Sequence, residues 1–373
     1  MVKKFILEKQ ADILKKQINQ NILKPVEMSK YLQFISTGSW LFNLALTNDI
    51  DCGYPIGRVI NPIGDYSTGK TLLACEAVNV AWYIEKLQKK KKIKIYYDEP
   101  EHAFDIGLAY KFKMPLEHIH GLKERLPTYN KEEDKEPFIH SRTVEDLHRN
   151  IERISSQAKS NDLILYVLDS LDSLTDAREI KHIAKKGIEK RDMGGSKAAA
   201  LSQLFRNVII KINNSNIILF IVSQVRMNVG QMFGPKLGRS AGKALDHYAS
   251  QIFWLTEKDQ IKSEYGINQG IEAGIHITKN KTGSRYNDVN INILRGYGID
   301  NYGSTVNFLW DKNILEKAGA YVVLPDDRKI YCKDLIELMA TDVEIQIYYK
   351  TMLQNYWNDI IEKSEIKRVP KYS

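Results

Sequence analysis

Short apolar runs alternate with longer amphipathic segments along most of this chain. The runs predict buried strands at residues 59–63, 93–97, 163–168 and 217–222, and two later strands are expected at 275–278 and 289–293. Amphipathic spacing predicts helices at 40–46, 72–87 and 144–158. Strands that alternate with helices are typical of an α/β fold, so we expect a mostly parallel central sheet.

The two ends of the chain depart from this alternation. Apolar residues at helical spacing predict an amphipathic helix over residues 3–23, and a strand is expected at 31–35. The apolar face of this helix needs a partner, either its own domain or a neighbouring subunit. Beyond residue 304 the pattern predicts short helices and a hairpin at 321–327, with Thr341 and Glu344 forming the capping box of the last helix.

Residues 64–71 read Gly-Asp-Tyr-Ser-Thr-Gly-Lys-Thr, which fits the P-loop pattern, and they lie between a predicted strand and a predicted helix. In such a loop the backbone N–H groups point at phosphates, the lysine reaches the β- and γ-phosphates, and the final hydroxyl can ligate Mg²⁺. The alternative is a glycine-rich surface turn, which the strand–loop–helix order disfavours. The predicted nucleotide-binding residues are Gly64, Asp65, Tyr66, Ser67, Thr68, Gly69, Lys70, Thr71 and Leu72.

Acidic residues follow two of the predicted strands. Asp98, Glu99 and Glu101 come after the strand at 93–97, and Asp169 comes directly after the strand at 163–168. Open α/β sheets bind ligands at the carboxyl ends of their strands, so a water-activating carboxylate is expected in the first group. Asp169 fits the position of a carboxylate beside Mg²⁺, with a helix N-cap as the alternative.

Charge and composition narrow the choice of partner. The chain has 373 residues and a formal net charge of +8, which favours an anionic partner such as nucleic acid, although lysine-rich surfaces also promote solubility. The basic, glycine-rich stretch at 225–242 predicts a mobile loop. The lysine run at 89–92 is expected to be a solvated turn, and the polar stretch at 123–137 an exposed excursion.

Cysteine spacing and hydropathy limit the compartment. Cys52, Cys75 and Cys332 stand far apart without metal-ligand spacing, which predicts reduced thiols in a cytoplasmic protein and no structural zinc. The apolar run near the N-terminus is too short for a signal peptide, and nothing approaches a membrane span. We therefore expect no membrane partner.

A set of short segments occurs in a fixed order: residues 35–39, the P-loop, 101–105, 168–170, 224–227 with 232–234, 244–245 with 248–250, 279–281 and 315–320. In this order, from about residue 35 to 324, the chain resembles the RecA family of DNA-strand-exchange recombinases. The resemblance implies an N-terminal polymerisation helix and strand at 1–35, a RecA-like P-loop ATPase core at 36–303 and a small C-terminal α/β domain at 304–373. A location in the cytoplasm, or in the host cytoplasm if the chain is viral, is also implied.

The resemblance assigns roles to the ATP and Mg²⁺ site. Besides Lys70, it implies that Glu101 activates the attacking water, and that Asp169 and Thr71 hold the metal. Gln224 resembles the residue that senses the γ-phosphate, and Lys279 and Lys281 resemble the pair that reaches the neighbouring subunit's ATP across a filament interface.

The resemblance also implies two DNA-binding loops, at about residues 185–195 and 225–242, in a helical filament on single-stranded DNA that samples homologous duplex DNA. Val229 corresponds to the apolar residue that wedges between bases. The DNA-binding positions are Met193, Gly194, Arg206, Arg226, Met227, Val229, Arg239, Gly242 and Lys243.

Several features depart from the family pattern. One residue is inserted between Asp98 and Glu101, so Glu99 competes for the role of base, and Glu101 is preferred because His102 and Ala103 follow it in the family order. Leu108 occupies the position of the adenine-stacking tyrosine, and the stretch at 123–137 is longer than in the family. Two alternative functions stay open: an accessory ATPase without strand exchange, and a ring-shaped helicase on the same core.

Overall fold

The computed structural model describes residues 33–88, 92–132, 134, 136–186, 196–227, 237–239, 242–283, 286 and 288–364. The chain forms two compact units, Met1–Phe34 and Ile35–Ser373. The helix predicted at 3–23 lies outside the described residues, and of the strand predicted at 31–35 only β1 (Phe34–Ile35) is described. All that follows concerns the second unit.

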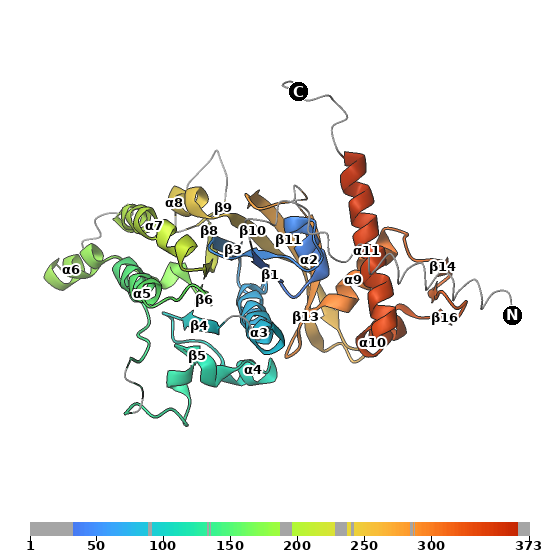
Figure 1. Ribbon diagram of the computed structural model, residues 1–373, viewed down its shortest axis with the longest axis horizontal. Coiled ribbons are helices and arrows are strands. Elements are labelled where there is room, and N and C mark those ends of the chain that lie inside the picture. The colour runs from blue at the N-terminus through green and yellow to red at the C-terminus, as the bar shows by residue number, and fades with distance from the viewer. Residues whose placement is uncertain are drawn as a thin grey trace, which may run out of the picture. The chain divides into compact units, whose positions relative to one another are not determined.

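A large mixed sheet with the strand order β13-β12-β11-β10-β3-β7-β6-β4-β5 forms the centre of this unit (Figure 1). Neighbouring strands run parallel from β10 through to β5, and antiparallel from β10 out to β13. The predicted α/β fold with a mostly parallel central sheet is confirmed. The strands are β3 (Val59–Gly64), β4 (Lys92–Asp98), β5 (Ile119–His120), β6 (Asp162–Leu168), β7 (Ile217–Ile221), β10 (Gln251–Lys262), β11 (Asn268–Asn280), β12 (Asp288–Leu294) and β13 (Gly298–Asp300).

Helices cover both faces of this sheet, which explains the uninterrupted apolar runs. Along β6, Leu163, Leu165 and Val167 belong to one hydrophobic cluster, whereas Ile164, Tyr166 and Leu168 belong to a second one. Successive side chains of a strand point to opposite faces, so both faces of β6 are buried. The helices are α2 (Trp40–Thr47), α3 (Lys70–Gln88), α4 (Ile106–Lys111), α5 (Val144–Ser156), α6 (Ala177–Lys186), α7 (Ser196–Asn214), α8 (Gly242–Tyr248), α9 (Asn301–Asp311), α10 (Cys332–Thr341) and α11 (Val343–Ser364).

Helix α11 shares a core with the start of the chain's second unit. Its buried Leu353 and Trp357 belong to the same hydrophobic cluster as Phe42 of α2. The indole N–H of Trp357 donates to Asn48 Oδ1 at 3.2 Å, and the Lys350 ammonium lies 2.6 Å from Asp51 Oδ1. A small sheet of β14 (Lys317–Ala318), β15 (Tyr321–Val323) and β16 (Lys329–Ile330) contacts α10 through β15. A domain boundary at residue 304 stays a prediction.

Two local predictions near the C-terminus have different outcomes. The hairpin is confirmed, because β15 pairs antiparallel with β16 across residues 324–328. The capping box of Thr341 and Glu344 is wrong. Helix α10 continues through Thr341, whose hydroxyl donates to the carbonyl of Glu337 at 3.0 Å, and Asp342 Oδ1 instead accepts the Glu344 N–H at 2.9 Å.

The stretch at 225–242 is more regular than predicted. Strands β8 (Ser223–Met227) and β9 (Leu237–Arg239) pair antiparallel within it, with Val225 opposite Arg239. Residues 228–236 and 240–241 lie outside the described residues, so a mobile loop at that point stays a prediction.

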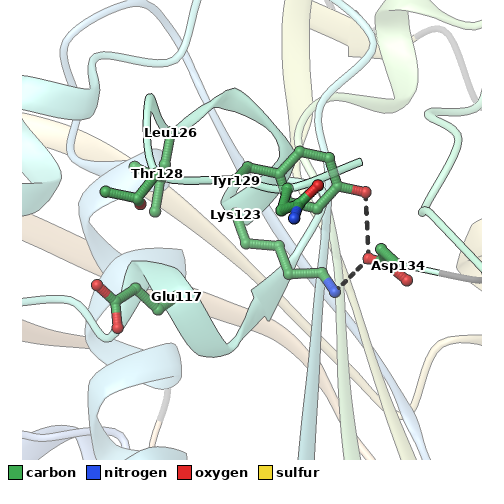
Figure 2. Close-up of a pocket in the computed structure, with 7 residues that line it drawn as sticks. Glu117, Lys123, Leu126, Thr128, Tyr129 and Asp134 are labelled. Carbon is green, nitrogen blue, oxygen red and sulfur yellow. Dashed lines mark hydrogen bonds and ion pairs between the residues drawn. The ribbon is translucent and has the colours of Figure 1, made fainter. Parts of the chain in front are cut away.

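The stretch at 123–137 is not simply an exposed excursion. It begins with a short 3-10 helix, Lys123–Arg125, and Leu126 is buried. Figure 2 shows Lys123 and Tyr129 converging on one oxygen of Asp134, at 2.6 Å from Lys123 Nζ and 3.2 Å from the Tyr129 hydroxyl, beside a cavity of about 550 Å³. The prediction holds only in part: residues 127–128 and 130–132 are exposed, but Lys123, Tyr129 and Asp134 bond to one another and Arg125 bonds to the loop after β4.

Cys52, Cys75 and Cys332 are free thiols, as predicted. Within the described ranges, no helix combines the length and the apolar character needed to cross a membrane.

Candidate functional site

The loop between β3 and α3 is shaped by its two glycines. A Cβ on Gly64 would lie 2.5 Å from Thr68 Oγ1, and one on Gly69 would lie 2.6 Å from a methyl group of Ile293. Gly69 also has a φ of +93°, which a residue without a Cβ adopts at little cost. Both glycines of the predicted P-loop are therefore required by the local geometry.

Backbone donors of this loop are left for an outside acceptor. Among the described residues, none accepts a hydrogen bond from the N–H groups of Ser67, Thr68 or Gly69. Unpaired N–H groups just before a helix N-terminus form a fixed positive surface. The loop therefore fits the phosphates of a nucleotide.

Lys70, the first residue of α3, lies folded across this loop. Its ammonium donates to the carbonyl of Asp65, and only 8% of the residue is exposed. Burial lowers the pKa of Lys70, while the carboxylates of Asp169 and Asp65 act in the opposite direction. A phosphate would place negative charge beside this ammonium and so favour its protonated form.

Asp169 and Thr71 form the part of the site that fits a metal. Thr71 Oγ1 donates to Asp169 Oδ2 at 2.8 Å, so a residue from α3 and one from the end of β6 are brought together as predicted. Burial raises the pKa of the Asp169 carboxyl, and the hydrogen bond from Thr71 opposes this shift. A hydroxyl next to a carboxylate at the loop is an oxygen donor set that suits Mg²⁺.

Glu101 and Glu99 occupy different surroundings. Glu101 Oε1 accepts a hydrogen bond from the Ser170 hydroxyl at 2.9 Å, another from the Ser173 hydroxyl, and a longer one from Gln224 Nε2 at 3.5 Å. Glu101 therefore lies beside the residue that follows Asp169.

Glu99 is held by Ala103 and by Arg125. Its Oε1 accepts the Ala103 N–H at 2.7 Å, and its Oε2 lies 3.3 Å from the Arg125 guanidinium. Burial raises the pKa of Glu99, and the Ala103 N–H and Arg125 oppose that shift. Both carboxylate oxygens of Glu99 already have partners within the chain. Glu101 is therefore the acid that remains next to the P-loop.

Gln224 is positioned by strand β8. Its backbone N–H donates to Asp172 Oδ2 at 2.7 Å, and β8 pairs with β3 so that Gln224 lies opposite Gly64. The partner of β3 changes from β7 to β8 at this level, and Asn61 bridges the two with bonds to the Ile221 carbonyl at 2.6 Å and the Ser223 hydroxyl at 2.9 Å. Asn61 could not be predicted from the sequence, because a single polar residue inside an apolar run belongs to no periodic pattern.

Comparison with known proteins points to the same family as the sequence motifs. The family described as RecA N-terminal domain matches residues 144–300, a span that includes Asp169 and Gln224. The protein called Protein RecA from Wigglesworthia glossinidia brevipalpis is 29% identical over 322 residues, which cover 86% of both chains. The chain is therefore similar to members of the RecA family, whose N-terminal domain model matches less than half of it. Protein RecA from Azoarcus sp. (strain BH72) is 27% identical over 81% of this chain and 77% of its own, and that from Rhizobium rhizogenes is 26% identical over 90% and 83%.

The RecA resemblance singles out Lys279 and Lys281, whose ammonium groups lie at the end of α8. Lys279 donates to the carbonyls of Asp246 and His247, the latter at 2.9 Å, and Lys281 donates to the His247 carbonyl at 3.5 Å. The Asn280 side chain between them donates to the Leu46 carbonyl at 2.7 Å. Within one subunit, both ammonium groups are thus held at the negative end of a helix rather than at the P-loop.

The DNA-binding positions implied by the RecA family are only partly described. Met193, Gly194 and Val229 lie outside the described residues. Arg206 is exposed on α7. The others belong to elements that follow Gln224 along the chain: Arg226 and Met227 in β8, Arg239 in β9, and Gly242 and Lys243 in α8.

Proposed function

We propose that this chain is an ATP-dependent DNA recombinase. Its subunits polymerise on single-stranded DNA with ATP and Mg²⁺ at their interfaces, and the filament pairs the strand with homologous duplex DNA and exchanges strands. The observation that carries this proposal is the position of Gln224. It contacts Glu101 at the nucleotide site and lies near the start of β8, which carries Arg226 and pairs antiparallel with β9.

The described residues divide the chemistry of hydrolysis among them. The free N–H groups of the loop and the Lys70 ammonium bind the β- and γ-phosphates. Thr71 and Asp169 would hold Mg²⁺, which supplies positive charge to the phosphate oxygens. Glu101 accepts the proton of the attacking water, and the serine hydroxyls of residues 170 and 173 hold its carboxylate in place.

Strand β8 also provides a route that couples the nucleotide site to DNA. A change in what Gln224 contacts is passed along β8, because its backbone is fixed by β3 on one side and β9 on the other. Arg226 and Arg239 lie on these strands, and Lys243 lies in the helix that follows. We expect these residues to bind the phosphate backbone, so affinity falls with salt and varies little with DNA sequence.

Electron microscopy and a strand-exchange assay test the proposal together. With single-stranded DNA and a slowly hydrolysed ATP analogue, helical filaments and exchange of homologous strands are the expected results. Closed rings would indicate a helicase instead, and filaments without exchange would indicate an accessory ATPase. Lys70→Ala should abolish nucleotide-dependent assembly, whereas Lys363→Ala, whose exposed ammonium pairs with Asp359, is the matched control.

A further inference from the structure

Tyr97 contacts Asp169, the acid of the candidate metal site. This residue of β4 is fully buried, and its hydroxyl donates to Asp169 Oδ2 at 3.0 Å. Thr71 donates to the same oxygen at 2.8 Å. The Phe104 ring packs against the tyrosine ring at a centroid distance of 4.9 Å. The hydroxyl is thus fixed by packing from several elements.

A buried tyrosine needs a hydrogen-bond partner, so a structural role is the first alternative. Tyr166 offers an internal comparison, because it is also fully buried and donates to Asp98 Oδ2 at 2.6 Å. Asp98 has no exposed surface and also accepts two bonds from Ser141, so that pair is part of the core. Asp169 is different, since its other partner is the P-loop residue Thr71 and Lys70 acts on it electrostatically.

The two donors on Asp169 leave its oxygens unequal. Two hydrogen bonds end on Oδ2, while none made by another described residue ends on Oδ1. A hydroxyl has one donor hydrogen and two acceptor lone pairs, so Thr71 can keep its bond to Asp169 while its own oxygen binds a cation. Without the Tyr97 hydroxyl, Thr71 alone would fix the orientation of the carboxylate.

We propose that Tyr97 is a positioning residue for Mg²⁺ at this site, an inference that rests on the proposed function. By holding Oδ2, Tyr97 fixes the rotamer of Asp169 before the metal arrives, so that less ordering is needed on binding. Removing the hydroxyl should raise the Mg²⁺ concentration required for nucleotide binding about tenfold, because a hydrogen bond to a charged group is lost. Hydrolysis at saturating Mg²⁺ should stay within about twofold of the original, because the groups that contact the water are unchanged.

Tyr97→Phe and Tyr166→Phe form a matched pair for the test. Each variant keeps its ring and loses one buried hydroxyl that donates to an aspartate. Binding of a fluorescent ATP analogue is measured against Mg²⁺ concentration in the unchanged protein and both variants, with thermal unfolding as a check of folding and ATP hydrolysis as a second readout. The inference is supported if only Tyr97→Phe shifts the Mg²⁺ curve to higher concentration.

Two results would overturn the inference. One is a Tyr97→Phe curve that coincides with that of the unchanged protein, and the other is an equal shift in Tyr166→Phe, which would indicate a general effect of lost core hydrogen bonds. If the unchanged protein binds no nucleotide at any Mg²⁺ concentration, the proposed function itself fails. That outcome is distinct from the first two, in which the unchanged protein binds normally.

Discussion

Glu99 and Glu101 show how two residues of the same type, close in sequence, differ in their chemistry. One residue is inserted before Glu101 relative to the RecA pattern, so the sequence left Glu99 as a competitor for the base, although the family order favoured Glu101. In the structure, Glu99 is paired with Arg125 and the Ala103 N–H, whereas Glu101 accepts from Ser170 and contacts Gln224. The ion pair of Glu99 could not be predicted from the sequence, since Arg125 lies in a different segment of the chain.

Glu101→Gln should keep ATP binding and slow hydrolysis by about 10²- to 10⁴-fold, because an amide cannot accept the proton of the attacking water. Glu99→Gln should change the rate far less. Single-turnover hydrolysis and nucleotide binding are measured for both variants under the same conditions. If Glu99→Gln causes the large loss and Glu101→Gln does not, the assignment of the base is wrong.

Glu76 of α3 is a buried acid that makes stability depend on pH. Burial raises its pKa from 4.5 to about 7, and a hydrogen bond from the Ile299 N–H opposes the shift. The backbone encloses it, since a Cβ on Gly298 would lie 2.5 Å from Glu76 Oε2. The folded state thus holds a proton that the unfolded chain releases, so this residue lowers stability as pH rises from about 4.5 to about 7.

Glu76→Gln should remove this pH dependence. Relative to the unchanged protein, the variant should gain free energy of unfolding between pH 5 and pH 8, by no more than about 3 kcal/mol. Urea denaturation at both pH values measures the difference, with the exposed Glu362→Gln as control. Equal differences between variant and unchanged protein at both pH values would contradict a raised pKa for Glu76.

At the scale of elements, apolar runs predicted the buried strands well, because a strand covered on both faces needs no polar positions. Strand β10 was missed, since its residues 256–262 are mostly exposed and charged and the run breaks off at Leu255. Motifs local in sequence, such as Lys70 with Thr71, also led to the candidate site, and the roles of its residues stay predictions. Tyr97 and Arg125 could not be predicted, because each reaches the site from an element that only the tertiary fold brings near.

The stretch at 123–137 has an effect on the site that can be tested separately. Arg125 lies 3.3 Å from Glu99 Oε2 and donates to the Phe104 carbonyl at 3.0 Å, so it spans the loop that carries Glu101. Arg125→Ala should lower the hydrolysis rate severalfold and leave nucleotide binding largely unchanged, because a small misplacement of a catalytic group is costly.

Lys123→Ala is the control for this variant. Lys123 belongs to the same short helix but pairs with Asp134, away from the loop after β4. Its rate should stay close to that of the unchanged protein. Equal losses in both variants would mean that the segment acts through its overall folding rather than through Arg125.

At the scale of the whole molecule, Lys279 and Lys281 decide whether the proposed ATP site is shared between subunits. Their ammonium groups bond to carbonyls at the end of α8 in their own subunit. This geometry is compatible with a helix cap alone. If they also reach a neighbour, their charges stabilise the transferring phosphoryl group as an arginine finger does when a partner supplies it.

A mixing experiment separates these two roles. Lys279→Ala/Lys281→Ala protein lacks the lysines but keeps Glu101, and Glu101→Gln protein lacks the base but keeps the lysines, so each is expected to be inactive alone. In a mixed filament, half of the hetero-interfaces combine an intact P-loop side from the first variant with intact lysines from the second. DNA-stimulated hydrolysis should therefore return in part on mixing and be greatest near equal amounts. If the two proteins assemble together on single-stranded DNA and no hydrolysis returns at any ratio, the lysines act only within their own subunit, because a helix cap cannot be supplied by a neighbour.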